Sequence, residues 1–359
     1  MSKQASVAVC IPTYNQAQYL VESVGSACRQ TYPNVEVWVS DDCSTDETSE
    51  VMAELCQQFP QVRYHRQPKN LGIAGNNTWL LSQPTTEFIL RLDSDDLLMP
   101  HYVETVVAVM QKFPEAGYAH TAVQEINEHG ENRSVRRVSR KEEFQDSEKA
   151  LLASVLGYRV AANICMFRSQ ALRELNVYES RPEFVEDYDL SVRIADAGYG
   201  NIYVDEILAC YRVWSDVKKA RSKRKHLQLK GYIRIFEESM LPAFQRRGWD
   251  TKVIDKQRKK FAILHSAYCF LPIYNQAERT ELVALLKKLG DSPALRLRLL
   301  ALSWGLAPFF EWQHATELKL KGIVKGWLSQ LQGASKIKTT GVGELRYDHL
   351  IVRAPKKSI

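Results

Sequence analysis

The first 112 residues alternate short apolar runs with segments of helical periodicity. The apolar runs cover residues 7–11, 35–39, 62–65 and 88–92, and the helical segments cover residues 19–29, 45–57, 72–81 and 102–112. This alternation predicts βαβ units with right-handed crossovers. We therefore expect an α/β fold, a Rossmann-like domain built on a mostly parallel central sheet.

Each predicted strand runs into a polar loop. The four loops read "PTYNQ", "DDCSTD", "QPKNLG" and "DSDD" in chain order. Parallel strands end at the same edge of their sheet, and ligands of such sheets bind outside that edge. The four loops are therefore predicted to form one binding rim.

Three carboxylates, Asp93, Asp95 and Asp96, follow the fourth strand directly. Residues two apart on an extended chain face the same side, so Asp93 and Asp95 can point together while Asp96 turns away. Two carboxylate oxygens suit Mg²⁺ or Mn²⁺, which leave the remaining ligand positions to water and phosphate. The alternative is that Asp96 caps the helix that follows it.

Two further acids, Asp41 and Asp42, close the second strand, and Asp46 follows in the same loop. An aspartate just before a helix commonly caps its first turn, which is the role expected for Asp46. Asp42 is expected to contact a ligand, since a carboxylate at a strand end can accept a hydrogen bond from a base or a ribose hydroxyl.

The seven cysteines are scattered and never form a CxxC pair, so neither a disulfide framework nor a zinc site is expected. The N-terminus lacks a basic region followed by an apolar core, and no apolar run reaches the roughly 18 residues of a membrane span. We expect a protein of the reducing cytoplasm, either dissolved there or peripheral on the cytoplasmic face of the membrane.

Charge divides the chain near residue 214. Residues 215–359 hold 29 Lys and Arg against 12 Asp and Glu, a net of +17, while residues 1–214 carry a net of −11. Such asymmetry indicates different partners for the two parts. We expect a first domain over residues 1–214 and a basic, mostly helical region over residues 215–359.

The basic region permits several interpretations. Its charged helices can be solvated faces, or they can dock on an anionic membrane surface together with the apolar stretch at residues 297–312. That stretch can equally be a buried core helix. No nucleic-acid-binding motif accompanies the charge, so no nucleic-acid partner is expected.

Four segments in this order, "VAVCIPTYNQAQYLVESVGSACRQTYPNVEVWVSDDCSTDET", "NLGIAGNN", "LRLDSDD" and "VEDYDLSVRIADAGY", resemble family 2 glycosyltransferases with the GT-A fold. The resemblance covers roughly residues 5–214, and the ordered set is more specific than any one member. It implies a nucleotide-sugar donor, most often a UDP-sugar, and a glycan or lipid-linked acceptor.

The resemblance also implies roles for individual residues. The nucleotide base would lie against Pro12, Thr13 and Tyr14 and would be bound by Asp42. The metal ion would be held by Asp93 and Asp95. The "ED" pair maps to Glu186 and Asp187, with Asp187 as the catalytic base. The remaining residues expected to contact the nucleotide sugar are Asn70, Gly72, Asn76, Asp93, Ser94 and Trp214.

The chemistry of sugar transfer needs such groups. Breaking the bond to a diphosphate builds negative charge that a bridging cation stabilises. The attacking hydroxyl has a pKa far above neutrality, so a carboxylate must accept its proton, and attack opposite the nucleotide inverts the anomeric centre. The alternative for the acids of this segment, Glu183, Glu186, Asp187 and Asp189, is that they only complement the positive end of a helix.

Three positions depart from the family pattern. Cys43 stands where many relatives have Gly, and Asn76, Asn77 and Thr78 stand near the place of an Arg-Asn pair. Trp214 stands where a His completes metal or diphosphate binding in relatives. The tryptophan at position 214 predicts either weaker metal affinity or an indole ring that stacks on a sugar or a nucleotide base.

The leading hypothesis is a metal-dependent inverting glycosyltransferase that builds a surface or secreted polysaccharide. A nucleotidylyltransferase would need a Gly-rich loop with Arg and Lys after the first strand, which "PTYNQAQY" does not offer. The third hypothesis is a catalytically degenerate GT-A domain that serves as a membrane or partner scaffold. The sequence does not specify the sugar, the linkage or the oligomeric state.

Overall fold

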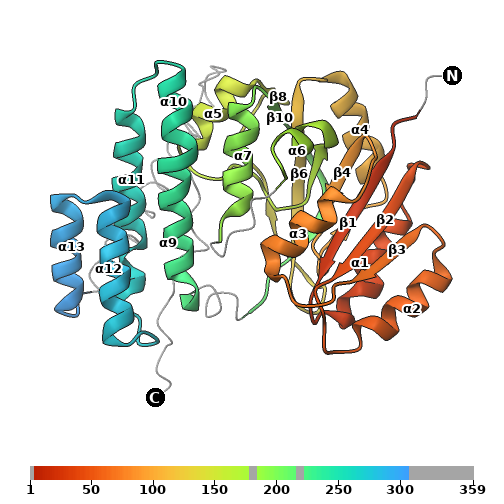
Figure 1. Cartoon of the computed structure of the whole chain (residues 1–359), viewed down its shortest axis with the longest axis horizontal. Helices are drawn as coiled ribbons and strands as arrows, with labels where there is room; N and C mark the ends of the chain where they lie inside the picture. Colours follow the sequence, from red (N-terminus) through yellow and green to blue (C-terminus); the bar gives the residue numbers. More distant parts are fainter. Residues whose placement is uncertain (1–3, 178–183, 216–221, 307–359) are drawn as a thin grey trace, which may run out of the picture. The chain divides into compact units, whose positions relative to one another are not determined.

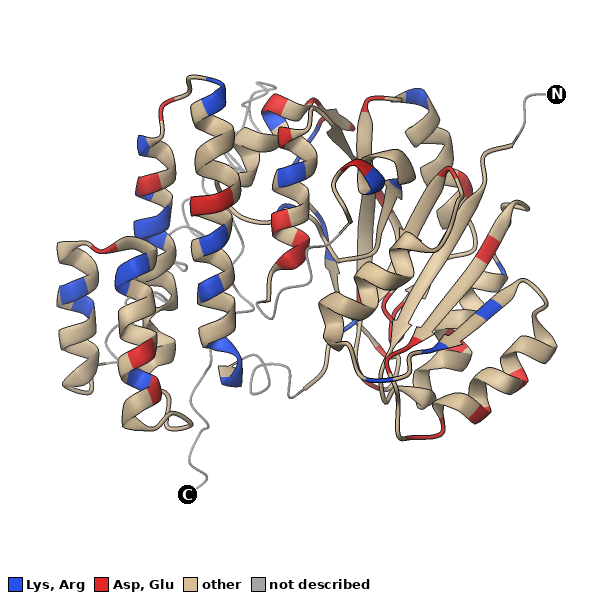
Figure 2. Ribbon diagram, viewed as in Figure 1, with Lys and Arg blue, Asp and Glu red and all other residues tan. Residues whose placement is uncertain are grey.

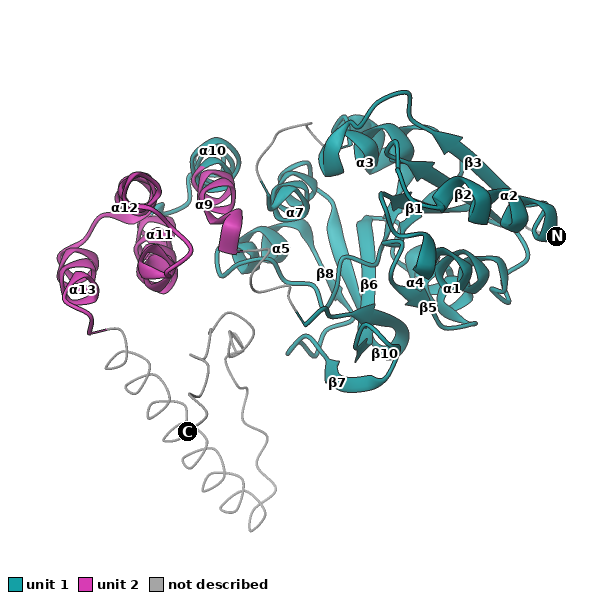
Figure 3. Cartoon of the chain, turned by 90° about the horizontal axis from the view of Figure 1, so that it is seen from below, with its two compact units in different colours: residues 1–220, 234–251 teal, residues 221–233, 252–359 magenta. Residues whose placement is uncertain are grey.

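The computed structural model of the chain describes residues 4–177, 184–215 and 222–306. The chain divides into two compact units, unit 1 with residues 1–220 and 234–251 and unit 2 with residues 221–233 and 252–359 (Figure 3). Residues 234–251 group with unit 1 although they follow the boundary predicted near residue 214. The division of function between residues 1–214 and 215–359 stays a prediction.

The first half of unit 1 is the predicted parallel α/β layer (Figure 1). Its strands lie in the order β3-β2-β1-β4, all parallel, with Val7 of β1 paired to Val35 and Phe88. The strands are β1 (Val7–Thr13), β2 (Val35–Asp41), β3 (Val62–Arg66) and β4 (Phe88–Arg91), and the helices are α1 (Ala17–Cys28), α2 (Thr48–Gln58), α3 (Gly72–Ser82) and α4 (Tyr102–Lys112).

The sheet continues past β4 with mixed polarity in the order β9-β6-β10-β5. β9 is antiparallel to β4 and β6, whereas β6 and β10 are parallel. The strands are β5 (Leu97–Leu98), β6 (Ala116–Ile126), β7 (Asn132–Arg136), β8 (Phe144–Gln145), β9 (Cys165–Arg168) and β10 (Gly200–Arg212). β7 lies in an Arg-rich segment, residues 131–144, and pairs with β6 as one arm of a hairpin.

Apolar side chains cover both faces of the sheet because alternate residues of each strand point to opposite sides. Val7, Val9 and Ile11 of β1 pack with residues of α1, α2 and α4, while Ala8 and Cys10 pack with residues of α3, α6 (Ser169–Glu174) and α7 (Glu186–Asp196). Both layers bury their strands, so the strand ends are fixed in position. This rigid frame carries the loops of the rim.

Three further helical segments complete unit 1: α5 (Ser147–Ser154), η1 (Ile235–Met240) and α10 (Leu241–Arg246). The Ser239 hydroxyl donates to Asp189 of α7 at 2.5 Å, and Arg247 donates to Asp196 at 2.6 Å. α7 ends at Asp196, and Gly198, two residues later, has a φ of +95°, which suits a glycine after the last turn. The segment over residues 234–251 thus fastens the outer side of α7.

Unit 2 is helical, with α9 (Lys225–Arg234), α11 (Lys252–His265), η2 (Ser266–Phe270), α12 (Gln276–Gly290) and α13 (Pro293–Ser303). Lys and Arg residues recur along these helices, interspersed with acids (Figure 2). α13 buries Leu295, Leu299 and Leu302 but leaves Leu297 69% and Trp304 72% exposed. Within the predicted apolar stretch, Leu299 and Leu302 are buried and most other residues up to 306 are exposed, while residues 307–312 lie outside the described part.

A search of the described helices for a membrane span found none with the required length and hydrophobicity.

One buried histidine gives the fold a pH dependence. His120 of β6 is fully buried beside the rings of Tyr118 and Tyr203, and neither ring nitrogen has a hydrogen-bond partner among the described residues. Burial, aided by the charge of Arg140, lowers the pKa of His120 to about 3. The unfolded chain protonates this ring near pH 6.5, so acid favours unfolding.

We expect the free energy of unfolding to fall by about 2 kcal/mol between pH 7.5 and pH 5 on account of His120 alone. The variant His120→Phe keeps an aromatic ring and removes that titration. Urea unfolding at the two pH values should therefore show a smaller acid loss for His120→Phe than for the wild type. Equal losses would contradict the assignment.

Candidate active site

The loops after β1, β2 and β3 meet around Asp42. The Asp42 amide donates to the Thr13 carbonyl at 2.9 Å, and the Asn70 side chain donates to the Asp42 carbonyl at 3.1 Å. One Asp42 carboxylate oxygen accepts from the Leu71 amide at 2.6 Å. Burial raises the pKa of Asp42, and the amides of Leu71 and Gly72 oppose that rise. Thr13, Asp42, Asn70 and Gly72, all predicted to contact the nucleotide, therefore lie together.

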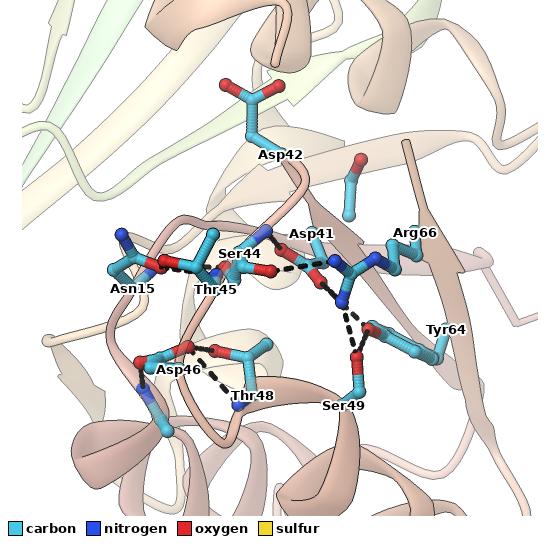
Figure 4. Close-up of polar contacts among 12 residues, drawn as sticks. Asn15, Asp41, Asp42, Ser44, Thr45, Asp46, Thr48, Ser49, Tyr64 and Arg66 are labelled. Carbon is cyan, nitrogen blue, oxygen red and sulfur yellow. Dashed lines mark hydrogen bonds and ion pairs between the residues drawn. The ribbon is translucent and has the colours of Figure 1, made fainter. Parts of the chain in front are cut away.

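The neighbouring acids of this loop are structural. Asp41 accepts from the Ser44 amide at 2.8 Å and from the Tyr64 hydroxyl at 2.9 Å, and Asp46 accepts from the Thr48 hydroxyl at 2.6 Å at the start of α2. Asp46 also accepts from the Ala17 amide at the start of α1. Figure 4 shows Asp42 pointing away from this network. The N-cap position of α2 is Glu47, and Asp46, one residue before it, accepts from the Thr48 amide at 3.2 Å.

Asn76 does not fit its predicted place on the nucleotide. It is 2% exposed, its amide oxygen accepts from the Ser40 hydroxyl at 2.6 Å, and its amide nitrogen donates to the Ser40 carbonyl at 3.0 Å. Asn76 therefore joins α3 to β2 inside the protein. Its position one turn into α3 faces the sheet, which the motif alone did not indicate.

The remaining residues of the first loop differ in exposure. Tyr14 is 48% exposed, Pro12 is half-buried beside Ser40, and the buried Thr13 hydroxyl lacks a partner. Cys43 adopts a φ of +64°, a left-handed backbone that glycine occupies without strain. The geometry explains why glycine suits this position.

Arg91, at the end of β4, joins two carboxylates from distant parts of the chain. Its guanidinium donates to Asp93 Oδ1 at 2.9 and 3.1 Å and to Asp187 Oδ1 at 2.5 Å. The Arg91 side chain is 6% exposed and that of Asp187 is 14% exposed. The two buried ion pairs of Arg91 thus connect the loop after β4 to the first turn of α7.

Glu186 lies beside this group. Burial and the negative charge of Asp187 raise the pKa of Glu186 to about 7. The residue before it, Val185, has a φ of +82°, which is rare for a β-branched side chain and costs about 1–3 kcal/mol. Strain of this kind is concentrated at functional sites, where the surrounding structure maintains it.

Asp95 contacts Trp214, the residue that departs from the family pattern. The Trp214 indole donates to Asp95 Oδ2 at 2.7 Å and packs edge-on against the ring of Tyr19 at 5.2 Å. Burial and the charge of Asp93 raise the pKa of Asp95, which the indole contact partly opposes. Trp214 therefore orients the carboxylate that was predicted to hold metal.

The other two residues of the tetrapeptide fix its loop. The Ser94 hydroxyl donates to Gln16 at 2.5 Å, tying this loop to the one after β1. Asp96 is 1% exposed and accepts from the Arg212 amide at 2.8 Å, so it does not cap α4, which begins six residues later. The alternative interpretation of Asp96 as a helix cap is wrong.

Sequence reasoning missed the two arginines that organise these acids. The predicted strand over residues 88–92 includes Arg91 without giving it a role, and no role is predicted for Arg212. The Arg212 guanidinium donates to the Asp95 carbonyl at 2.7 Å and to Glu22 of α1 at 2.8 Å. An arginine inside an otherwise apolar strand was the available signal, since a buried guanidinium needs carboxylates or carbonyls as partners.

The carboxylates present fit a divalent cation. Asp93 Oδ2 and Asp95 Oδ1 accept no hydrogen bond from another residue in the described part of the chain. The raised pKa of Asp95 reflects its burial first and the charge of Asp93 second, and a cation would stabilise both charged carboxylates. No group of three or more ligand side chains occurs among the described residues. Magnesium and manganese sites of this class complete their shells with water and phosphate oxygens.

The matching sequences and structures are glycosyltransferases. Residues 8–175 match the family model described as Glycosyl transferase family 2. Chondroitin synthase from Escherichia coli is 27% identical over 238 residues, which are 65% of this chain and 32% of that protein. The chain thus spans about a third of that relative's length, and less of several others.

Two solved structures share the fold. TarS 1–349 from S. aureus superposes with a TM-score of 0.59 at 18% identity over 88% of both chains. The mannosyltransferase PcManGT from Pyrobaculum calidifontis, solved with GDP-Man and Mn²⁺, has a TM-score of 0.54 at 18% identity, covering 94% of this chain and 89% of that one.

Unit 1 therefore has the GT-A fold, with Asp42, Asp93 and Asp95 in loops at the ends of its parallel strands. Through residues 8–175 the chain is similar to glycosyltransferase family 2.

We expect Arg91→Lys to lower turnover about a hundredfold, because a single ammonium cannot hold Asp93 and Asp187 at once and a small displacement of reacting groups is costly. The free energy of unfolding should fall by no more than about 2 kcal/mol. Arg63→Lys, on the exposed pair with Glu36, is the matched control. Wild-type turnover in Arg91→Lys, measured by release of nucleoside diphosphate, would contradict the role.

Proposed function

We propose that this chain is a metal-dependent inverting glycosyltransferase that moves a sugar from a nucleoside diphosphate sugar to a hydroxyl of a glycan or lipid-linked acceptor. The observation that carries the proposal is the buried contact of Arg91 with Asp93 and Asp187. It joins a predicted metal ligand to the predicted base, so donor and acceptor chemistry would meet at one point.

The donor would lie across the loops around Asp42. The nucleotide base would lie beside Thr13 and Tyr14 and would donate a hydrogen bond to Asp42. Asn70 and Gly72 would lie along the rest of the nucleotide. A UDP-sugar is the proposed donor class, supported by TarS structures solved with UDP and with UDP-GlcNAc. PcManGT was solved with GDP-Man, so a guanine nucleotide is the second candidate.

Asp93 and Asp95 would hold Mn²⁺ or Mg²⁺, with Trp214 fixing the orientation of Asp95. A divalent cation held there would stabilise the negative charge that develops on the leaving diphosphate. Arg91 keeps Asp93 in place through two hydrogen bonds to one oxygen, which leaves the other oxygen for the cation.

Asp187 would accept the proton of the attacking hydroxyl. Arg91 orients this carboxylate, and the first turn of α7 presents it at the rim. Glu186, with a pKa near 7, would be partly protonated at neutral pH and would limit the negative charge beside Asp187. Attack from the side opposite the nucleotide would invert the anomeric centre, and one base suffices for that displacement.

The acceptor is proposed to belong to a surface or secreted polysaccharide. Chondroitin synthase of Escherichia coli supports this class of product. The basic region over residues 215–359 would bind the acceptor or an anionic membrane surface at the cytoplasmic face, with exposed Leu297 and Trp304 of α13 as the apolar contribution.

The deciding experiment incubates the chain with a panel of UDP- and GDP-sugars and Mn²⁺ and measures the nucleoside diphosphate released. Asp187→Asn should retain donor binding and lose turnover, because it keeps the shape of the side chain and removes the base. Release from no donor, while the donors still bind, would favour a scaffold that has lost catalysis.

Two neighbouring carboxylates provide a matched pair for the metal site. Asp95→Asn should lower turnover at least about a hundredfold, since it removes a charged metal ligand. Asp96→Asn should stay within about tenfold of the wild type, because burial already raises the pKa of Asp96 and its bond to Arg212 needs only an oxygen. Equal losses in the two variants, measured at saturating Mn²⁺, would refute the assigned ligand.

The contact between Trp214 and Asp95 should set metal affinity. Trp214→Phe removes the donor and should raise the Mn²⁺ concentration for half-maximal turnover about tenfold, which is typical of losing an outer-shell partner. The control is Trp79→Phe on α3, because the Trp79 ring stacks on His65 of β3, away from Asp95. A Mn²⁺ titration of turnover distinguishes the two, and an unchanged midpoint in Trp214→Phe would exclude the role.

A further inference from the structure

A second polar recess lies in unit 1 between α5, α7 and the strands β6, β8 and β10. It is small and partly open, and its polar lining consists of Tyr118, Gln145, Ser154, Arg159, Ser191 and Asn201. We call it the α5–α7 recess. None of its residues belongs to the candidate active site.

The recess is rich in hydrogen-bond donors. Among the described residues, nothing accepts from the Tyr118 hydroxyl, the Gln145 amide nitrogen or the Arg159 guanidinium. The Asn201 amide oxygen accepts from Arg140 at 2.5 Å, which leaves the amide NH₂ of Asn201 as a further donor. The pKa of Tyr118 is raised by burial, so its hydroxyl keeps its proton at neutral pH.

Its acceptors are already used or weak. The Ser154 carbonyl accepts from the Tyr188 hydroxyl, and the Ser154 and Ser191 hydroxyls donate to backbone carbonyls of their own helices at 2.7 and 2.8 Å. No carboxylate lines the recess in the described part of the chain. A cationic or donor-rich ligand would therefore find few partners here.

Positive charge accumulates at this place without a paired acid. Arg140 donates only to the carbonyls of Glu142, Glu143 and Asn201 and to the Asn201 amide oxygen, and Arg159 forms no ion pair with a described residue. Burial lowers the pKa of Arg140 to about 10; the charge of Arg159 contributes to this fall, and the charge of Glu142 opposes it. Two guanidinium groups thus repel each other across a small, partly enclosed space.

We propose that the α5–α7 recess binds a tetrahedral oxyanion, a phosphate or sulfate group, with Arg159, Tyr118, Gln145 and Asn201 as its donors. An oxyanion supplies several acceptors and the negative charge that Arg140 and Arg159 lack. The group can be a free ion or the terminal phosphate of a larger ligand. Ser191 follows Asp187 by four residues on α7, so the recess lies one helical turn from the predicted base.

The test is a calorimetric titration of the full chain with inorganic phosphate in EDTA, at constant ionic strength set with chloride. Arg159→Gln should weaken phosphate binding about tenfold and Tyr118→Phe severalfold, as expected for losing a charged and a neutral donor. Arg173→Gln, an exposed arginine on α6, and Asp95→Asn should bind phosphate like the wild type. The Asp95→Asn arm separates this inference from the proposed donor site.

A second titration with glycerol phosphate identifies the source of the anion. Tighter binding of the ester than of free phosphate assigns the recess to a phosphorylated ligand, and binding of free phosphate alone assigns it to the ion. Either result supports the proposal when it depends on Arg159. No binding of either probe, or equal binding in Arg159→Gln with an unchanged circular dichroism spectrum, overturns it.

Discussion

The buried contact of Arg91 with Asp93 and Asp187 is the interaction on which the rest of the site depends. A guanidinium in the apolar interior is costly unless carboxylates satisfy it, and here the two carboxylates come from segments about a hundred residues apart. The contact therefore fixes the first turn of α7 against the end of β4. Removing either partner would leave a buried charge, so position and stability are coupled at this point.

The loops around this contact are joined to one another by short polar contacts. Gln16 connects the loop after β1 to Ser94, Asn15 connects it to Ser44 and Thr45, and Arg212 connects the end of β10 to Asp95. Because β1, β2 and β4 are parallel and buried on both faces, their loops share one rigid edge. A rigid edge allows carboxylates to be held close together before any ligand binds.

Much of this arrangement could be predicted from the sequence. The four strands and helices of the first half, the position of Asp46 at the start of α2 and the grouping of Asp42 with Asn70 follow from local patterns. Arg91 could not be assigned, since its partner Asp187 is set by tertiary structure, and Asn76 was misassigned because a motif does not reveal which helix face meets the sheet. The apolar run over residues 159–167 predicts a strand there, but β9 begins only at Cys165, where pairing with β4 and β6 starts.

The most direct test of the central claim is a crystal structure of the chain with a nucleoside diphosphate and Mn²⁺. Anomalous scattering locates manganese without reference to the surrounding groups. The account predicts one manganese ion that contacts Asp93, Asp95 and the diphosphate. It also predicts that the nucleotide base lies against Asp42. A nucleotide bound elsewhere, or an ion held without either aspartate, would contradict it.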